Sequence, residues 1–289
     1  MKRILLYLFF VPVFAFSQQG ETKTPMLTTE LASGLYRIFV NNAVAVVASV
    51  SENGVLLIDA GYERTANDLL NQVKTLSNEP IKYIINTHIH GDHTGGNLVL
   101  GINADIIAHK NVKEFLSHEQ GQGERKTAAF PEYAQPNITF TDRLNMDFNG
   151  ETLEMIHLPG GHTNSDIVIF FPKSNVLVVG DLLFANYFPY VDVGNGGNPF
   201  KYLENVQWLT DNFPSDVTVV GGHGPVYTID EYKKYHSTLI ETIDIIRKHK
   251  KKGMTQDKMK EQRILKEWES WGSWFITEDR WIDTLYPFL

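Results

Sequence analysis

One short segment of this chain carries more metal-binding side chains than a buried core normally contains. Four such side chains fall within six consecutive positions: His88, His90, Asp92 and His93. The apolar run 81–86 directly before them is short, β-branched and aromatic, so it predicts a buried strand. The glycines that follow predict a loop at the end of this strand rather than a helix.

The spacing within this segment favours two metal ions close together. In an extended chain His88 and His90 point the same way, because side chains alternate with a period of two. Asp92 and His93 are adjacent, so in a loop they can turn toward a second point. A single buried histidine is usually a hydrogen-bonded core residue. Three histidines and an aspartate beside several glycines instead indicate a metal site.

The same kind of side chain follows the ends of other predicted strands. These further positions are Asp59, His162, Asp181 and His223. Loops at strand ends are where protein scaffolds usually place their chemistry. Glycines beside these positions allow sharp turns and a close approach of the backbone.

The order of predicted elements indicates the fold class. Runs of strands alternate with helices predicted at about 64–76, 201–212 and 227–252. This pattern predicts an α/β (α+β) protein in which two β-sheets pack face to face under outer helices. No linker divides the chain, so residues 18–289 are expected to form one domain with an aromatic-rich helical segment at about 254–289.

The first seventeen residues predict a signal peptide. Lys2 and Arg3 precede an apolar run, and Ala15-Phe16-Ser17 resembles a cleavage site. The run is too short for a comfortable permanent membrane anchor, so the protein is expected to be periplasmic or secreted. The chain has no cysteine, which excludes disulfides and thiolate metal ligands.

The net charge of −8 argues against a nucleic-acid partner, because phosphate binding requires clustered lysine and arginine. The basic run 247–252 is interpreted as the solvated end of a helix. A small-molecule substrate is therefore expected. The sequence leaves the oligomeric state open.

In identity and order these residues resemble the five motifs of the metallo-β-lactamase superfamily, over roughly residues 30–250. The resemblance implies a four-layer αββα sandwich of two mixed sheets flanked by helices. It also implies the metal ligands: His88, His90 and His162 on the first ion; Asp92, His93 and His223 on the second; Asp181 bridging both. Asp59 would hydrogen-bond the ligand loop.

Asp181 distinguishes branches of this family. The cysteine-bearing β-lactamases have a thiolate there and the all-histidine β-lactamases typically have a serine, whereas Asp181 resembles glyoxalase-II-like hydrolases and lactonases. The resemblance therefore implies an exported hydrolase with two zinc ions and a bridging hydroxide oriented by Asp92. An ester, thioester, lactone or β-lactam would be cleaved. Iron or manganese remain possible metals. A dedicated metallo-β-lactamase and a metal-dependent phosphodiesterase or nuclease are the alternatives.

The loop 184–198 after Asp181 leaves two interpretations open. Tyr190 or Tyr187 would donate a hydrogen bond to a developing oxyanion, or the aromatic residues would simply pack on the sheet edge. No lysine or arginine follows Asp181 before Lys201, so no cation that binds a substrate carboxylate is expected there. The tryptophans at helical spacing are expected to pack in the core: Trp268, Trp271 and Trp274. Five histidines outside the motifs are interpreted as structural or exposed: His109, His118, His157, His236 and His249.

Overall fold

The computed structural model describes residues 24–121, 123 and 126–289. The predicted signal peptide, residues 1–17, lies outside this range. Within the described residues no helix has both the length and the apolar character needed to cross a membrane.

The first sheet has seven strands that follow one another in chain order. They are β1 (Met26–Ala32), β2 (Leu35–Val40), β3 (Val44–Ser51), β4 (Gly54–Ile58), β5 (Ile81–Asn86), β6 (Asp105–His109) and β7 (Ile138–Phe140). Neighbours from β1 to β4 pair antiparallel, and those from β4 to β7 pair parallel. Asn41 and Asn42 join β2 to β3 with φ of 53° and 52°. Asparagine tolerates this left-handed conformation, which favours a tight turn between the two antiparallel strands.

The second sheet has six strands in the order β13-β12-β11-β10-β9-β8. They are β8 (Arg143–Phe148), β9 (Glu151–His157), β10 (Ile167–Phe171), β11 (Val176–Phe184), β12 (Thr218–His223) and β13 (Tyr227–Thr228). Only β11 and β12 pair parallel; the other neighbours are antiparallel. Every residue of β11 is buried, which accounts for its continuous apolar run.

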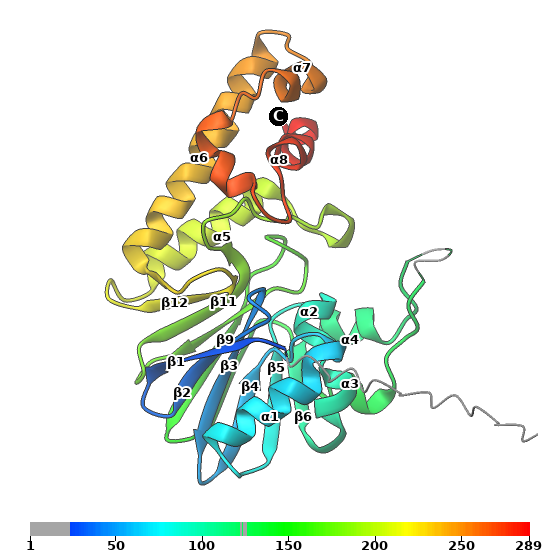
Figure 1. The fold of residues 1–289 in the computed structure, drawn as a ribbon, viewed down its shortest axis with the longest axis vertical. Coiled ribbons are helices and arrows are strands. Elements are labelled where there is room, and N and C mark those ends of the chain that lie inside the picture. Colours follow the sequence, from blue (N-terminus) through cyan, green and yellow to red (C-terminus); the bar gives the residue numbers. More distant parts are fainter. Residues whose placement is uncertain (1–23, 122, 124–125) are drawn as a thin grey trace, which may run out of the picture.

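Most of the helices cover the outer faces of the two sheets, whereas the last two lie beyond the sheets against a long helix (Figure 1). The helices are α1 (Ala66–Leu76), α2 (Gly91–Thr94), α3 (Asn97–Leu100), α4 (Lys110–Leu116), α5 (Pro199–Asn212), α6 (Ile229–Lys251), α7 (Gln256–Glu261) and α8 (Glu278–Leu285). Helix α1 packs on the first sheet, and α5 and α6 pack on the second. Side chains cap the N-termini of α5 and α6: Asn198 accepts from the backbone of the first turn of α5, and Thr228 and Glu231 form a capping box on α6.

A hydrophobic core lies between the two sheets and draws on both. The first sheet contributes residues such as Leu56 and Ile85, and the second contributes Met155, Ile169 and Val178. Separate apolar clusters lie under the outer helices. The four-layer αββα sandwich expected from the sequence is therefore confirmed.

Two local predictions were wrong, and two strands were missed. Residues Gly91–Thr94 form the short helix α2 rather than a loop, and β11 continues through Asp181 instead of ending before it. Strands β1 and β8 were not anticipated. Both contain only exposed and half-buried side chains, so neither carries the continuous apolar signal of a fully buried strand.

The segment after α6 folds back against that helix. It comprises α7, a 3-10 helix (Lys266–Gly272), α8 and a final 3-10 turn (Tyr286–Phe288). Trp281 anchors it: the ring is buried, stacks on Phe188 at 5.8 Å between centroids and donates from Nε1 to Thr242 Oγ1 at 3.0 Å. Trp271 stacks on Tyr235 at 5.5 Å. The aromatic composition of this segment thus serves mainly to attach it to α6 and the 184–198 loop.

Candidate metal centre

The fold brings together all seven residues that the resemblance assigns to metal binding. They form two adjacent groups of ligand atoms, each within 4.8 Å of one another: a first group of His88, His90, His162 and Asp181, and a second group of Asp92, His93 and His223. These residues come from the ends of β5, β9 and β12, from α2 and from β11. They therefore converge at one edge of the sandwich, although they span more than a hundred positions in sequence.

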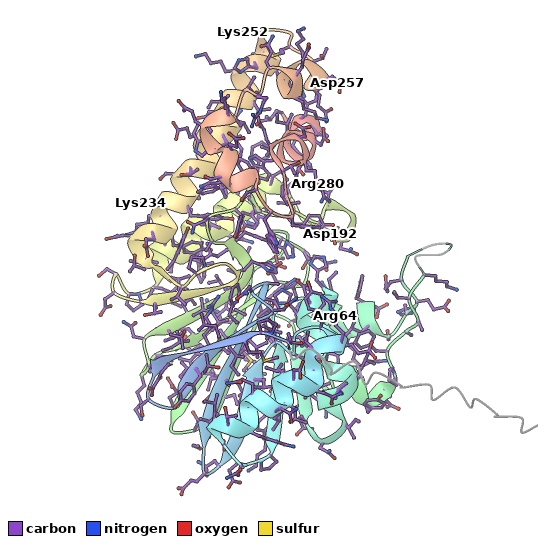
Figure 2. The ribbon with its side chains drawn as sticks, viewed as in Figure 1. Arg64, Asp192, Lys234, Lys252, Asp257 and Arg280 are labelled. Carbon is purple, nitrogen blue, oxygen red and sulfur yellow. The ribbon has the colours of Figure 1, made fainter. Side chains whose placement is uncertain are left out.

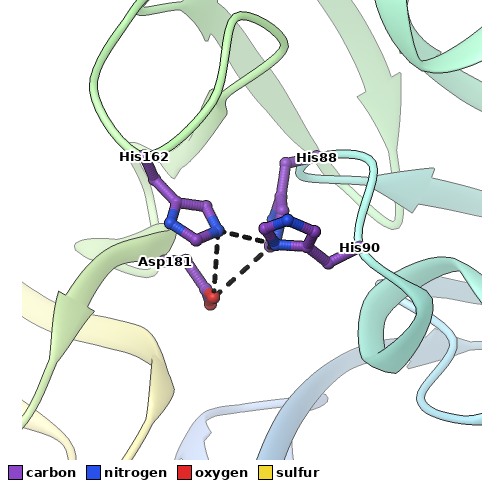
Figure 3. A group of neighbouring side chains, drawn as sticks. All are labelled: His88, His90, His162 and Asp181. Carbon is purple, nitrogen blue, oxygen red and sulfur yellow. Dashed lines mark hydrogen bonds and ion pairs between the residues drawn. The ribbon is translucent and has the colours of Figure 1, made fainter. Parts of the chain in front are cut away.

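The first group closes tightly around Asp181 (Figure 3). His162 Nε2 lies 2.8 Å from His90 Nδ1 and 3.3 Å from Asp181 Oδ2. His88 Nε2 lies 3.1 Å from His90 Nδ1 and 3.7 Å from Asp181 Oδ2. Two ligand atoms on a tetrahedral zinc ion lie roughly 3.3 Å apart, so these separations suit one small cation.

Asp181 also reaches the second group. Its Oδ1 lies 3.1 Å from His93 Nε2, and its Oδ2 lies 3.3 Å from His223 Nε2. Asp92 Oδ2 lies 3.5 Å from His223 Nε2 and 3.7 Å from His93 Nε2. One carboxylate therefore contacts both groups. A side chain on Gly222 would place its Cβ 2.1 Å from Asp181 Oδ1, so glycine is required for this close approach.

Each of the five rings has an oxygen partner for the nitrogen that faces away from the site. His162 Nδ1 donates to Tyr190 O and His223 Nδ1 donates to Ala43 O, both at 2.7 Å. His93 Nδ1 lies 2.7 Å from Asp59 Oδ2, and His90 Nε2 lies 2.9 Å from Asp192 Oδ2. His88 Nδ1 lies 3.0 Å from Thr87 Oγ1. These partners place the ring protons outside, so the inner nitrogens present lone pairs to the site.

Asp59 holds the ligand loop from behind. Besides His93 it accepts from the Thr87 backbone N–H at 2.7 Å and from the Thr87 hydroxyl at 2.9 Å. Asp59 adopts φ of 63°, a left-handed conformation that is uncommon for a residue other than glycine. Such strain persists where the surroundings enforce it, often at functional sites. Here it directs one carboxylate at two neighbouring parts of the loop.

Burial and charge separate the two groups electrostatically. Burial lowers the pKa of His88 well below its ordinary value and that of His162 to about 3, so both rings are neutral and able to bind a cation. Burial also opposes the charge of His93 and His223. The carboxylate of Asp181 nevertheless raises the pKa of both, with further contributions from Asp59 and Asp92 at His93 and from Asp92 at His223. The carboxylates around His93 and His223 therefore favour positive charge at this side of the site.

The inward-facing atoms fit a bound cation better than they fit one another. His93 Nε2 and Asp181 Oδ1 are buried, and neither has a hydrogen bond of acceptable geometry within the described part of the chain. A buried polar atom without a partner is costly, and a metal ion would satisfy both at once. The donors are imidazole nitrogens and carboxylate oxygens only, a set that suits zinc and also iron or manganese.

Two supporting carboxylates were missed by the sequence analysis. Burial would raise the pKa of Asp192, but hydrogen bonds from His90 and Asn195 lower it to about 2, so it is charged beside His90. Asp166 accepts from the backbone N–H of His162 at 2.7 Å and from that of Thr163. The proximity of Asp166 to His162 in sequence was a usable signal. Asp192 had none, because it lies a hundred residues from its partner.

A cavity of about 940 Å³ opens over the two groups. Tyr190 lines it, with its ring 5.6 Å from that of His90, and Trp274 and Phe275 line it from the C-terminal segment. The prediction that Trp274 packs in the core was therefore wrong, because 38% of it is exposed. Arg64 also lines the cavity, so a cation does reach it, although not from the strand after Asp181. Tyr187 instead lies against Trp274, at 5.2 Å.

Figure 2 shows three charged residues in order from the C-terminal helices toward the first sheet: Arg280, Asp192 and Arg64. Arg280 lies on α8 and holds Phe275: it donates to the carbonyl of that residue at 2.9 Å and lies 4.6 Å from its ring centroid. Asp192 belongs to the loop 184–198 and lies between Arg280 and Arg64 in this view. This side of the molecule thus combines parts of the chain that are far apart in sequence.

The five remaining histidines lie outside both groups. His109 and His157 stack on each other at 3.6 Å, and His236 is buried against α5. His118 is exposed, and His249 is half-buried near the end of α6. None of them belongs to a candidate metal group among the described residues.

Comparison with known proteins relates this geometry to a family. The family model described as the metallo-beta-lactamase superfamily matches residues 37–228. The chain is 25% identical over 232 residues to metallo-beta-lactamase type 2 of Bacteroides fragilis, covering 76% of this chain and 88% of that protein. It is 27% identical over 175 residues to hydroxyacylglutathione hydrolase of Prochlorococcus marinus (strain MIT 9301), covering 60% and 62%. The solved structure of a metallo-beta-lactamase from Pontibacter korlensis has the same fold, with a TM-score of 0.61 at 21% identity over 74% of this chain and 99% of that one.

Proposed function

The chain belongs to the metallo-beta-lactamase superfamily, and on that premise we propose that it is a hydrolase with two metal sites. The first group would hold one ion, the second group the other, and Asp181 would bridge them. Zinc is the preferred metal, because imidazole and carboxylate are its usual ligands in proteins. The substrate would be a small molecule with an ester, thioester, lactone or β-lactam bond.

One observation carries this proposal: four buried rings direct their free nitrogens at a single buried carboxylate, Asp181, and the ring of His90 joins two of them. A structural zinc site closes its coordination with four ligands and needs no cavity. Here seven ligands form two groups that border a large open cavity. This arrangement favours catalysis over a purely structural role.

Two bound divalent cations would supply Lewis acidity and a nucleophile formed from water at neutral pH. The side chains of the protein then have separate tasks. Asp92 borders the cavity and is the most exposed carboxylate of the two groups, so we assign it to orient the attacking water and to accept its proton. Asp59 and Asp192 hold the rings of His93 and His90 in place.

Tyr190 is the proposed donor to the oxyanion that develops on the substrate. Its ring lines the cavity beside His90 and His162, and its hydroxyl has no hydrogen bond to another described residue. Burial, together with the nearby Asp192, raises the pKa of the Tyr190 hydroxyl, so the hydroxyl keeps its proton at neutral pH. A protonated phenol can donate a hydrogen bond to such a charge.

A dedicated β-lactamase is the second candidate. Arg64 lines the cavity, and β-lactams carry a carboxylate that a guanidinium can bind. Two relatives named metallo-beta-lactamase also favour it. A phosphodiesterase or nuclease is less well supported, because Arg64 is the one lysine or arginine among the described residues that line this cavity, and the net charge is −8.

Export is a separate proposal and rests on the sequence of residues 1–17. We propose that the mature protein begins near Gln18 and is periplasmic or secreted. The N-terminal sequence of protein isolated from the native cell envelope tests this. Retention of Met1 on protein in the cytosol would contradict it.

The decisive experiment combines metal analysis with a substrate panel. Protein purified under mild conditions should contain about two ions per chain. The panel consists of nitrocefin, an aryl ester, a lactone, a thioester and an aryl phosphodiester, all tested on one zinc-loaded preparation. Turnover of an ester, thioester or lactone with two bound ions supports the proposal, and faster hydrolysis of nitrocefin identifies a β-lactamase. Full activity at one ion per chain would contradict the two-site assignment.

A further inference from the structure

The cavity over the metal centre has one wall that does not come from the region matched by the family model. That match ends at residue 228, whereas Trp274 and Phe275 lie in the turn between the 3-10 helix (Lys266–Gly272) and α8. Both side chains line the cavity. The segment that carries them therefore lies outside the matched region, and it is placed directly against the proposed reaction site.

The two residues differ from the other aromatic residues of the segment. Trp271 and Trp281 are attached by stacking on Tyr235 and Phe188. Trp274 and Phe275 are instead 38% and 47% exposed. Large apolar side chains beside a cavity gain free energy when a ligand removes them from water. Their exposure thus marks a surface that a ligand would cover.

The position of these rings is fixed by the surrounding structure. Trp274 lies 4.9 Å from the ring of His223 and 6.5 Å from that of Phe184, and Phe275 meets Tyr190 edge-on at 5.5 Å. Arg280 holds Phe275 through its ring and its carbonyl. An ordered aromatic wall costs little conformational entropy on binding.

The other residues that line the cavity are also mostly apolar. They include Leu98 and the stretch 128–131, which contains Phe130. The charged side chains besides the metal ligands are Glu63 and Arg64, one of each sign. A cavity lined largely by apolar side chains, with candidate ligand histidines among its lining residues, suits a substrate whose reacting bond carries an extended apolar group.

We propose that Trp274 and Phe275 determine substrate specificity by binding an aromatic or long apolar substituent of the substrate while its scissile carbonyl lies at the metal centre. This inference rests on the proposed hydrolase function. It adds that small acyl groups without such a substituent are poor substrates. The ring of the substituent would pack against the exposed faces of Trp274 and Phe275, where aromatic pairs gain free energy beyond simple burial.

The test uses two matched pairs of compounds on the zinc-loaded protein. The first pair is p-nitrophenyl butyrate and p-nitrophenyl 4-phenylbutyrate, compared by kcat/KM. The second pair is the free acids butyrate and 4-phenylbutyrate, compared by calorimetric Kd, which requires no turnover. The wild type should prefer the phenyl member of both pairs, and Trp274→Ala and Phe275→Ala should each reduce that preference about three- to tenfold.

Ratios within a pair separate specificity from damage to the metal centre, because loss of metal lowers both members equally. Trp274→Phe should keep most of the preference. Ile240→Ala, which removes an exposed apolar side chain of α6 that does not line the cavity, should leave it unchanged. A wild type without preference, or an alanine variant that weakens both acids equally, would overturn the inference. If neither ester is hydrolysed but the acid preference behaves as described, the binding surface stands and the proposed reaction on esters falls.

Discussion

Two clusters of buried and half-buried histidines in this protein show what separates a metal site from ordinary packing. In the metal centre, five rings point their inner nitrogens at Asp181 and Asp92, and each outer nitrogen has an oxygen partner. In the second cluster, His109 and His157 stack flat at 3.6 Å with an interplanar angle of 14°. Their ring faces meet instead of their nitrogens.

The difference lies in the carboxylates and not in the burial of the rings. Burial lowers the pKa of both His109 and His157, that of His109 to about 4. Their nitrogens serve the backbone: His109 Nδ1 accepts from Asn111 N–H at 3.3 Å, and His157 Nε2 donates to Asn164 O at 3.1 Å. Buried histidine by itself is therefore a weak sign of metal binding. Convergent nitrogens around a buried carboxylate are a strong one.

Removing Asp181 should produce the largest effect, because this carboxylate contacts both groups. We expect Asp181→Ala to lose both ions and to reduce kcat/KM by at least about a thousandfold, since the nucleophile and the Lewis acid depend on the ions. Metal analysis and steady-state kinetics on the same preparation check this. Asp181→Asn keeps one ligand oxygen and is the matched control for the lost charge. Retention of two ions by Asp181→Ala would show that the carboxylate is not a shared ligand.

Smaller and more selective effects are expected from the carboxylates behind the rings. Asp59→Asn should weaken the second ion, because Asp59 holds His93, and Asp192→Asn should weaken the first, because Asp192 holds His90. Loss of such a partner typically costs about 10- to 100-fold in metal affinity. Competition with a chelator, followed for each ion separately, measures the two affinities. If both variants weaken the same ion, the division into two groups is wrong.

The sequence, with the family resemblance that its motifs carry, was sufficient to predict the αββα layers and to name every candidate ligand that the fold brings together. The motifs of the resemblance identified these residues, and most of them lie just after or at the end of an apolar strand; Asp181 instead lies within β11, and His162 lies in the loop after β9. Strands β1 and β8 gave a weaker signal, because they lie at sheet edges and none of their residues is fully buried. Asp192 and the cavity position of Arg64 depend on contacts between distant segments, which local patterns do not specify.

The C-terminal tryptophans are a second case in which a local sequence pattern does not specify the position of a side chain. Helical spacing predicted one shared role for Trp268, Trp271 and Trp274, namely packing. Trp271 does pack on Tyr235, but a turn at Gly272 sends the chain toward the cavity and exposes Trp274. A Cβ at position 272 would lie 2.9 Å from the Glu278 backbone nitrogen, so the close turn depends on glycine. Whether an aromatic residue packs or lines a site was therefore decided by one turn.

The smallest effect is expected at the stacked pair, and it concerns stability rather than metal binding. His109→Asn should leave metal content and kcat/KM unchanged, because His109 belongs to neither group. Asparagine also retains an N-cap acceptor for α4, the task that His109 performs through Nδ1. A fall in the number of bound ions in this variant would mean that the two clusters are coupled.

The pH dependence of unfolding tests the difference between the stacked pair of His109 and His157 and the metal centre. The pKa of His109 in the folded protein is about 4, below the value of about 6.5 expected when unfolded. As pH falls from about 6.5 toward 4, the unfolded chain therefore binds a proton that the folded protein resists, and stability is lost over that range. The full difference corresponds to about 1 to 3 kcal/mol of unfolding free energy at pH 4.

The variant His109→Asn cannot take up this proton. Between pH 7 and 4 its free energy of unfolding, measured by urea denaturation, should therefore fall by about that much less than the wild type's. Release of metal at low pH affects both proteins alike and cancels in the difference. Equal acid sensitivity of the two proteins would show that the stacked pair is not a buried neutral element of the fold.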